Sequence, residues 1–84
     1  MKKFNINNHM YIQITSEGWK YLQHVNTESY IRQCVLSKEV LIEGKPWYRL
    51  QTHEIFSMFP VQITGRLPLF ETTVMFDDED LTEV

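Results

Sequence analysis

The fold class of this chain is decided by residues 9–25, which read HMYIQITSEGWKYLQHV. The first part alternates between apolar and polar side chains, which indicates a strand with one buried face. Its apolar positions are Met10, Ile12 and Ile14. Thr15 or Ser16 can then cap a helix, because a hydroxyl accepts a hydrogen bond from the free N–H groups of the first turn. A strand that leads directly into a helix predicts a mixed fold of helices and sheet.

A second helix is expected after a short break at Asn26. Thr27 can cap it, and four apolar side chains then recur with the spacing of one helix face. They are Tyr30, Ile31, Cys34 and Val35. The pattern predicts a helix over residues 27–37 that buries this face and exposes Arg32 and Gln33.

A hairpin is expected over residues 39–51, where two alternating segments flank a polar turn. Pro46 has no N–H group and cannot adopt a positive φ, so a two-residue turn fits poorly. We therefore expect a five-residue loop at residues 43–47, with Ile42 opposite Tyr48. In this register, one face carries Val40, Ile42, Tyr48 and Leu50.

The rest of the chain predicts a short helix over residues 53–59, an extended piece from residue 61 and a last strand over residues 72–76. The element order is then β-α-α-β-β-α-β-β, an α+β domain with an antiparallel sheet packed by two or three short helices. We expect one globular domain over residues 1–76. The acidic residues 77–84 are expected to form a solvated tail.

The composition is that of one small folded domain. Hydrophobic residues make up 43% of the 84 residues, and charged residues make up 23%. No apolar run approaches the ~18 residues of a membrane span. The single cysteine excludes an intrachain disulfide, and polar residues follow Lys2 and Lys3 where a signal peptide would be apolar. We therefore expect a cytoplasmic protein without a membrane partner.

The order strand, helix, short break, helix and hairpin over residues 9–51 resembles a winged-helix domain that lacks its first helix. Residues 14–22, ITSEGWKYL, are similar to the phrase L-T-x-x-G-x-x-x-L of bacterial winged-helix regulators. The resemblance implies nucleic-acid binding, with residues 27–37 as the recognition helix and residues 38–51 as the wing. It implies groove and phosphate contacts from Ser29, Arg32, Gln33, Lys38 and Lys45.

No constellation in the sequence specifies a reaction. The three histidines lack the paired spacing of zinc ligands, and Cys34 lies on the apolar face of the second helix. The three glycines are too far apart to form a loop that cradles phosphate. The sequence therefore predicts a protein that is not an enzyme and holds neither a metal nor a cofactor.

A protein-binding surface is expected on the hairpin, on the face opposite its apolar side chains. Leu41, Trp47 and Arg49 share that face in the expected register, and tryptophan and arginine are enriched at binding hot spots. The alternative is that a later apolar side chain covers Trp47, which then belongs to the core. The candidates for this cover are Phe70, Val74 and Phe76. The acidic tail offers a second contact, for a basic partner surface, through Asp77, Asp78, Glu79 and Asp80.

The leading hypothesis is a non-enzymatic interaction module, a small regulator or accessory subunit that binds a larger protein. A second copy of the chain is another occupant of the hairpin surface, and nucleic acid is the alternative partner. The formal net charge of −3 comes from the acidic end, so it argues only weakly against nucleic acid. Small size and mild acidity also suit accessory proteins of phages and mobile elements, such as inhibitors of host defence.

Overall fold

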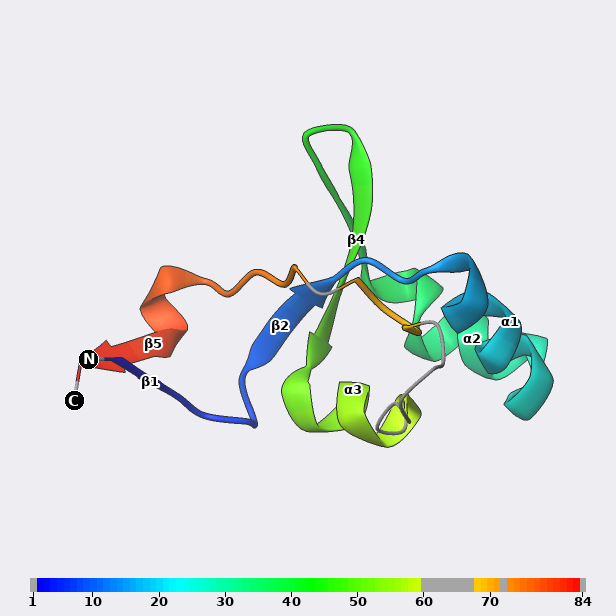
Figure 1. Cartoon of the computed structure of the whole chain (residues 1–84), viewed down its shortest axis with the longest axis horizontal. Coiled ribbons are helices and arrows are strands. Elements are labelled where there is room, and N and C mark those ends of the chain that lie inside the picture. The colour runs from blue at the N-terminus through cyan, green and yellow to red at the C-terminus, as the bar shows by residue number, and fades with distance from the viewer. Residues whose placement is uncertain (1, 60–67, 72, 84) are drawn as a thin grey trace.

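The computed structural model describes residues 2–59, 68–71 and 73–83 (Figure 1). It contains three α-helices, two short 3-10 helices and five strands within these ranges. In chain order they are β1 (Lys2–Phe4), β2 (His9–Ile12), α1 (Ser16–Val25), α2 (Glu28–Cys34), η1 (Leu36–Lys38), β3 (Glu39–Ile42), β4 (Lys45–Gln51), α3 (Thr52–Met58), η2 (Asp78–Asp80) and β5 (Leu81–Glu83). The predicted α+β fold with an antiparallel sheet is confirmed.

The caps expected at Thr15 and Thr27 are present, whereas Thr52, which could cap the short helix after the hairpin, lies within α3 and makes no cap hydrogen bond. The hydroxyl of Thr15 accepts a hydrogen bond from the N–H of Gly18 at 3.0 Å, and that of Thr27 accepts one from the N–H of Tyr30 at 3.1 Å. Each bond satisfies one of the N–H groups that a helix leaves free in its first turn. The second helix is shorter than expected, because α2 ends at Cys34 and the chain tightens into η1.

The core lies between the helices and one face of a three-stranded sheet with the order β2-β4-β3. Met10 of β2 lies opposite Leu50 of β4, and Ile12 lies opposite Tyr48, so these four side chains share the face toward the helices. We call this the helix face of the sheet and the opposite one the outer face. Each helix contributes to the buried cluster, which includes Leu22, Ile31, Ile55, Met58 and Phe59.

The hairpin has a tighter turn than expected. Glu43 and Gly44 alone form it, with φ values of 53° and 77°, and Ile42 pairs with Lys45. The expected five-residue loop and the pairing of Ile42 with Tyr48 are therefore wrong. In an antiparallel hairpin the pair beside a two-residue turn exchanges hydrogen bonds and the next pair does not. Pro46 is in that next pair, so its missing N–H group costs the ladder nothing.

The chain after residue 67 forms a C-terminal arm, described at residues 68–71 and 73–83. It runs antiparallel to the N-terminal part of the chain along the free edge of β2. Tyr11 and Met75 exchange backbone hydrogen bonds of 2.8 and 3.1 Å, and β5 pairs with β1 at the end of the arm. Residues 77–83 thus form η2 and β5 instead of a separate tail, although Asp78 and Glu79 within them are exposed.

The arm also departs from the strand expected at residues 72–76. Isolated bridges at Phe70 and Met75 take its place, and residue 72 lies outside the described residues. The extended piece expected from residue 61 lies outside them as well. The arm crosses α1 at Gly18, where a Cβ atom would lie 1.9 Å from the carbonyl oxygen of Leu69. Glycine is therefore required there for the backbones to approach each other.

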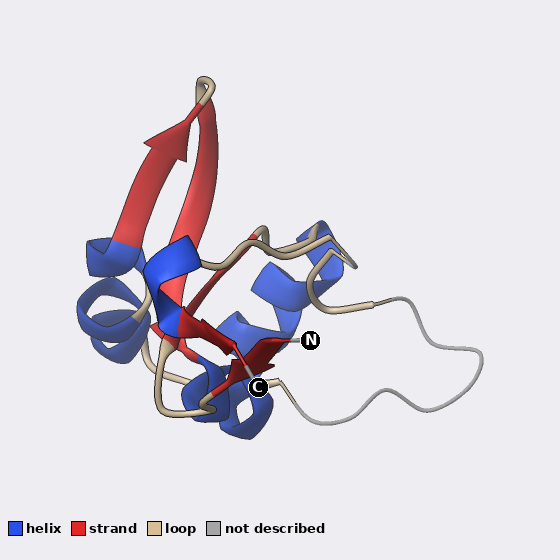
Figure 2. Cartoon of the chain, turned by 90° about the vertical axis from the view of Figure 1, so that its left-hand side faces the viewer, coloured by secondary structure: helices blue, strands red, loops and turns tan. Residues whose placement is uncertain are grey.

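The β3–β4 hairpin projects away from the helices, while β1 and β5 lie at the far end of the molecule from α1 and α2 (Figure 1). Figure 2 shows the same hairpin standing clear of the remaining elements. The structure is elongated, with principal extents of 40 × 30 × 23 Å. Its surface therefore offers three separate regions: the helix pair, the hairpin and the terminal strands.

Candidate functional site

A groove between α1 and α2 is the candidate site, with a volume of about 490 Å³. Three apolar side chains line it, namely Trp19 of α1, Ile31 of α2 and Leu36 of η1. Its polar lining consists of Gln23, Asn26, Glu28 and Arg32. We call this hollow the α1–α2 groove.

The apolar lining is held by the core beneath it. Trp19 packs edge-on against Tyr48 of β4, with ring centroids 5.4 Å apart and an interplanar angle of 80°. This geometry is favourable for aromatic pairs and anchors the indole to the sheet. Ile31 is buried, but Leu36 remains 46% exposed at the edge of the groove. The groove therefore combines a rigid floor with an apolar side chain that is still accessible to a partner.

The polar side chains of the groove carry no net charge. The Arg32 guanidinium pairs with the Glu28 carboxylate one helical turn away, with 3.0 Å between Nη2 and Oε1. Both side chains are largely exposed, so this pair contributes little to stability. The pair therefore gives the edge of the apolar floor a polar character without a net charge.

The phenol of Tyr48 stays neutral beneath the groove. Burial is the main reason that its pKa is raised, and the negative charge of Glu39 and a hydrogen bond to it act in the same direction. The Tyr48 hydroxyl donates to Oε1 of Glu39 over 3.4 Å. Tyr48 thus supports Trp19 from the sheet as an uncharged side chain and is not itself part of the groove lining.

The surface predicted on the hairpin is not assembled as expected. Leu41 lies opposite Pro46 and Trp47 lies opposite Val40, so Leu41 and Trp47 point to different faces. Trp47 is only 8% exposed, whereas Leu41 is 69% exposed. The predicted cluster of Leu41, Trp47 and Arg49 is therefore wrong, because the tighter turn shifts the register. Arg49 shares the outer face with Trp47 and pairs with the C-terminal arm.

The two aromatic side chains that were candidates to cover Trp47 stack on other rings instead. Phe70 packs on Phe59 with 5.7 Å between ring centroids, and Phe76 packs on Phe4 with 4.4 Å. Val74 packs against the core cluster. Trp47 is thus buried on the outer face, as the alternative requires, but Phe70 and Phe76 stack on other rings rather than cover it.

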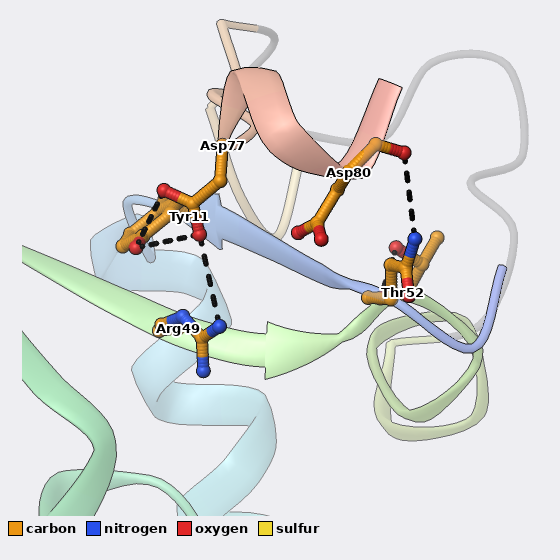
Figure 3. Close-up of polar contacts among 6 residues, drawn as sticks. Tyr11, Arg49, Thr52, Asp77 and Asp80 are labelled. Carbon is orange, nitrogen blue, oxygen red and sulfur yellow. Dashed lines mark hydrogen bonds and ion pairs between the residues drawn. The ribbon is translucent and has the colours of Figure 1, made fainter. Parts of the chain in front are cut away.

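The acidic residues of the predicted tail have different surroundings. Asp77 contacts Tyr11 and Arg49, and the backbone carbonyl of Asp80 accepts a hydrogen bond from the side chain of Asn8 at 3.4 Å (Figure 3). Asp78 and Glu79 are exposed. Two of the four acids therefore belong to the contacts that hold the arm, and two remain accessible to a partner.

The residues that the winged-helix resemblance implies as nucleic-acid contacts are all exposed. They are Ser29, Arg32, Gln33, Lys38 and Lys45. They come from α2, η1 and the first residue of β4. The charge of Arg32 is paired with Glu28, which leaves Lys38 and Lys45 as the positive charges of this set.

The described part of the chain contains no group of three or more histidine, cysteine, aspartate or glutamate side chains that could hold a metal ion. Cys34 is half-buried rather than fully buried. No helix within the described ranges has the length and apolar character needed to cross a membrane. Comparisons with protein-family models, with curated proteins and with solved structures gave no match.

The α1–α2 groove was not predicted from the sequence. Trp19 and Ile31 fit the pattern of buried helix positions, and periodicity alone does not distinguish a core residue from the floor of an open groove. Leu36 provides the signal that was available. Leu36 comes directly after Val35, the last residue of the apolar face of the second helix, and the helical period places it on a different side. It can therefore be buried only by something other than the core beneath that face.

Proposed function

We propose that this chain is a cytoplasmic, non-enzymatic accessory module that binds a larger protein through the α1–α2 groove. The observation that carries the proposal is an accessible apolar floor with a neutral polar edge. The groove has a volume of about 490 Å³ and is lined by Trp19, Ile31 and Leu36. Apolar side chains of this kind, fixed by a core and surrounded by polar groups, are typical of protein-binding surfaces.

The walls of the groove favour a helical segment of the partner. The backbone groups along α1 and α2 are bonded within their own helices, so they cannot pair with an added strand. A partner must therefore bind through its side chains. An amphipathic helix does so, because its apolar side chains at i, i+3 and i+4 lie on one face and can enter the groove together.

The test compares two leucine or isoleucine substitutions that add the same charge. Leu36→Lys places an ammonium group at the groove, and Ile6→Lys places one at a site that is 62% exposed, lies in the connection between β1 and β2 and is not part of the groove lining. Immobilised wild-type protein is used to capture a partner, which is then purified and titrated against each variant. We expect Leu36→Lys to raise Kd at least ten-fold, or about 1.4 kcal/mol, and Ile6→Lys to leave it unchanged.

Two outcomes would contradict the proposal. One is a Kd that Leu36→Lys does not change. The other is an equal rise for both variants, which would assign the effect to added positive charge rather than to the groove. Because Leu36 and Ile6 are both well exposed, we expect each variant to remain folded, with a stability change within about 1 kcal/mol.

Nucleic-acid binding is the second candidate function. It is supported by the path from β2 through α1 and α2 to β3 and β4, together with a hairpin that projects away from the helices (Figure 1). A helix pair followed by a projecting hairpin is the order that the winged-helix resemblance implies. The paired charge of Arg32 and the two remaining lysines offer few phosphate contacts, so we expect weak, salt-sensitive binding at most.

Fluorescence anisotropy with duplex and single-stranded oligonucleotides tests this candidate. Lys38→Ala and Lys45→Ala should each lower the slope of log affinity against log salt by about 0.9 if the lysine contacts a phosphate of duplex DNA. Lys2→Ala is the matched control, because Lys2 lies on β1 at the far end of the molecule. An absence of binding at low salt would exclude nucleic acid as the partner.

A further inference from the structure

Asp77 of the C-terminal arm is held by two side chains of the sheet (Figure 3). The Tyr11 hydroxyl lies 3.1 Å from Oδ1 and 3.2 Å from Oδ2 of the carboxylate, to which it donates. Nη2 of Arg49 lies 3.7 Å from Oδ2. The carboxylate is thus bound by a neutral donor and by a cation.

The two side chains that bind Asp77 are positioned by the sheet rather than by the arm. Tyr11 of β2 and Arg49 of β4 lie directly opposite each other, so they share the outer face. The guanidinium carbon of Arg49 lies 5.9 Å from the centre of the Tyr11 ring, within the range of a cation–π contact. We call this pair the Tyr11–Arg49 cradle. The register of β2 and β4 thus places both side chains next to each other on the outer face, whatever occupies the space beside them.

The contact between Asp77 and the cradle is open to exchange. The Arg49 and Asp77 side chains retain 40% and 32% of their exposure, so water screens their attraction. Asp77 is the first of four consecutive acids, and Asp78 and Glu79 remain exposed beside it. The segment that occupies the cradle is therefore an acidic peptide.

We infer that the Tyr11–Arg49 cradle is a second recognition site, for an acidic segment of a partner protein, and that Asp77 occupies it in the free chain. The occupant seen in the structure defines the chemistry, because an aspartate in an acidic peptide is what the cradle already binds. The inference does not depend on the α1–α2 groove, which lies on different elements. An acidic partner segment and the arm would compete for the same two donors.

The experiment uses the acidic segment of the chain itself as the probe, a capped peptide of residues 76–81, FDDEDL. A capped FNNQNL peptide of equal length without charge is the control probe. Asp77→Ala vacates the cradle, and Asp78→Ala makes the same chemical change at an exposed acid for which no contact with the cradle is seen. Binding is measured by isothermal titration, and the Arg49 Nε–H signal is followed by NMR.

We expect Asp77→Ala to bind the acidic peptide at least ten-fold more tightly than the wild type and Asp78→Ala do. The Arg49 Nε–H signal should shift on binding, and FNNQNL should not bind. Arg49→Ala, made together with Asp77→Ala, should abolish the gain. Asp77→Asn preserves the size of the side chain and provides the same comparison, against Asp78→Asn, if the alanine variant is not fully folded.

Three results would overturn the inference. The first is equal affinity of the Asp77 and Asp78 variants, which would mean that only net charge matters. The second is a gain that persists without Arg49, which would place the peptide elsewhere. The third is tighter binding of a thymidine oligonucleotide than of the peptide to the vacated cradle, which would assign the site to nucleic acid.

Discussion

Leu41 and Trp47 lie close together in the β3–β4 hairpin, but their side chains are on opposite faces of the sheet. Leu41 is on the helix face beyond the reach of the core and is largely exposed, whereas Trp47 is buried on the outer face. Residue type alone would assign the binding role to tryptophan. The register reverses this assignment, because it determines which face each side chain occupies.

Trp47→Ala should therefore lower the free energy of unfolding by about 3–5 kcal/mol, because removal of a buried indole leaves a cavity. Urea denaturation followed by far-ultraviolet circular dichroism measures the loss. Leu41→Ala is the control on the same hairpin, and we expect a change within about 0.5 kcal/mol for it. A loss below about 1 kcal/mol for Trp47→Ala would contradict the interior position of this side chain.

At the scale of elements, the first residue of the β3–β4 turn has an unfavourable backbone conformation. Glu43 adopts a positive φ of 53°, a conformation that disfavours side chains other than asparagine, aspartate and glycine. Gly44 follows with a φ of 77°, so the turn has the geometry that an Asn-Gly pair adopts most readily. The register is therefore maintained by the pairing of the strands, since the first turn residue opposes it.

Glu43→Asn should stabilise the protein by about 0.5–1 kcal/mol, because it relieves part of the cost of a left-handed residue. Equilibrium unfolding in urea checks the change. Glu71→Asn removes the same charge at an exposed site outside the hairpin and should have little effect. If both variants gained equally, charge rather than turn conformation would be the cause.

The parts of the fold that could be predicted from the sequence are those with local causes. Met10 and Ile12 alternate along β2, and Thr15 and Thr27 cap their helices, because each signal lies within a few residues of its effect. The hairpin register does not follow from local turn preferences, because these assign Pro46 to the turn, whereas Pro46 is a strand residue at a position without a ladder bond.

The arm and the Tyr11–Arg49 cradle with its Asp77 occupant could not be predicted, because they depend on long-range pairing. Tyr11 meets Asp77 across 66 positions of the chain, and no local pattern specifies that contact. The acidic composition of the arm indicates a solvated tail when it is considered alone. Its pairing with β1 and β2 depends on free strand edges, which exist only after the sheet has formed.

At the scale of the whole molecule, the N-terminal and C-terminal parts of the chain hold each other. β1 pairs with β5, Tyr11 with Met75, and Ile14 with Phe70. The arm therefore runs antiparallel to the N-terminal part of the chain along most of its described length. A sheet of two short strands is at best marginally stable alone. The β1–β5 pair is therefore expected to depend on the contacts beside it, among them the stacking of Phe4 on Phe76 and the Asp77 contacts.

Removal of residues 77–84 should lower the free energy of unfolding by about 1–3 kcal/mol, because it removes β5, the Tyr11 hydrogen bond and the Arg49 ion pair. Urea titration monitored by tryptophan fluorescence measures the loss, with removal of residue 84 alone as the control. Hydrogen exchange should show lost protection in β1 and retained protection in β4. An unchanged midpoint would contradict a stabilising role for the end of the arm.

Lys2 and Glu83 lie opposite each other on adjacent strands, which are about 4.8 Å apart in a sheet. A linker of a few residues is long enough to close such a distance. Residues 2–83 are therefore suited to backbone cyclisation, in which a short linker joins residue 83 to residue 2. The ring would lower the conformational entropy of the unfolded chain far more than that of the folded chain. The same native contacts would then keep the protein folded up to a higher temperature. Reopening the ring between Glu43 and Gly44 would give a circular permutant that begins and ends at the tip of the hairpin.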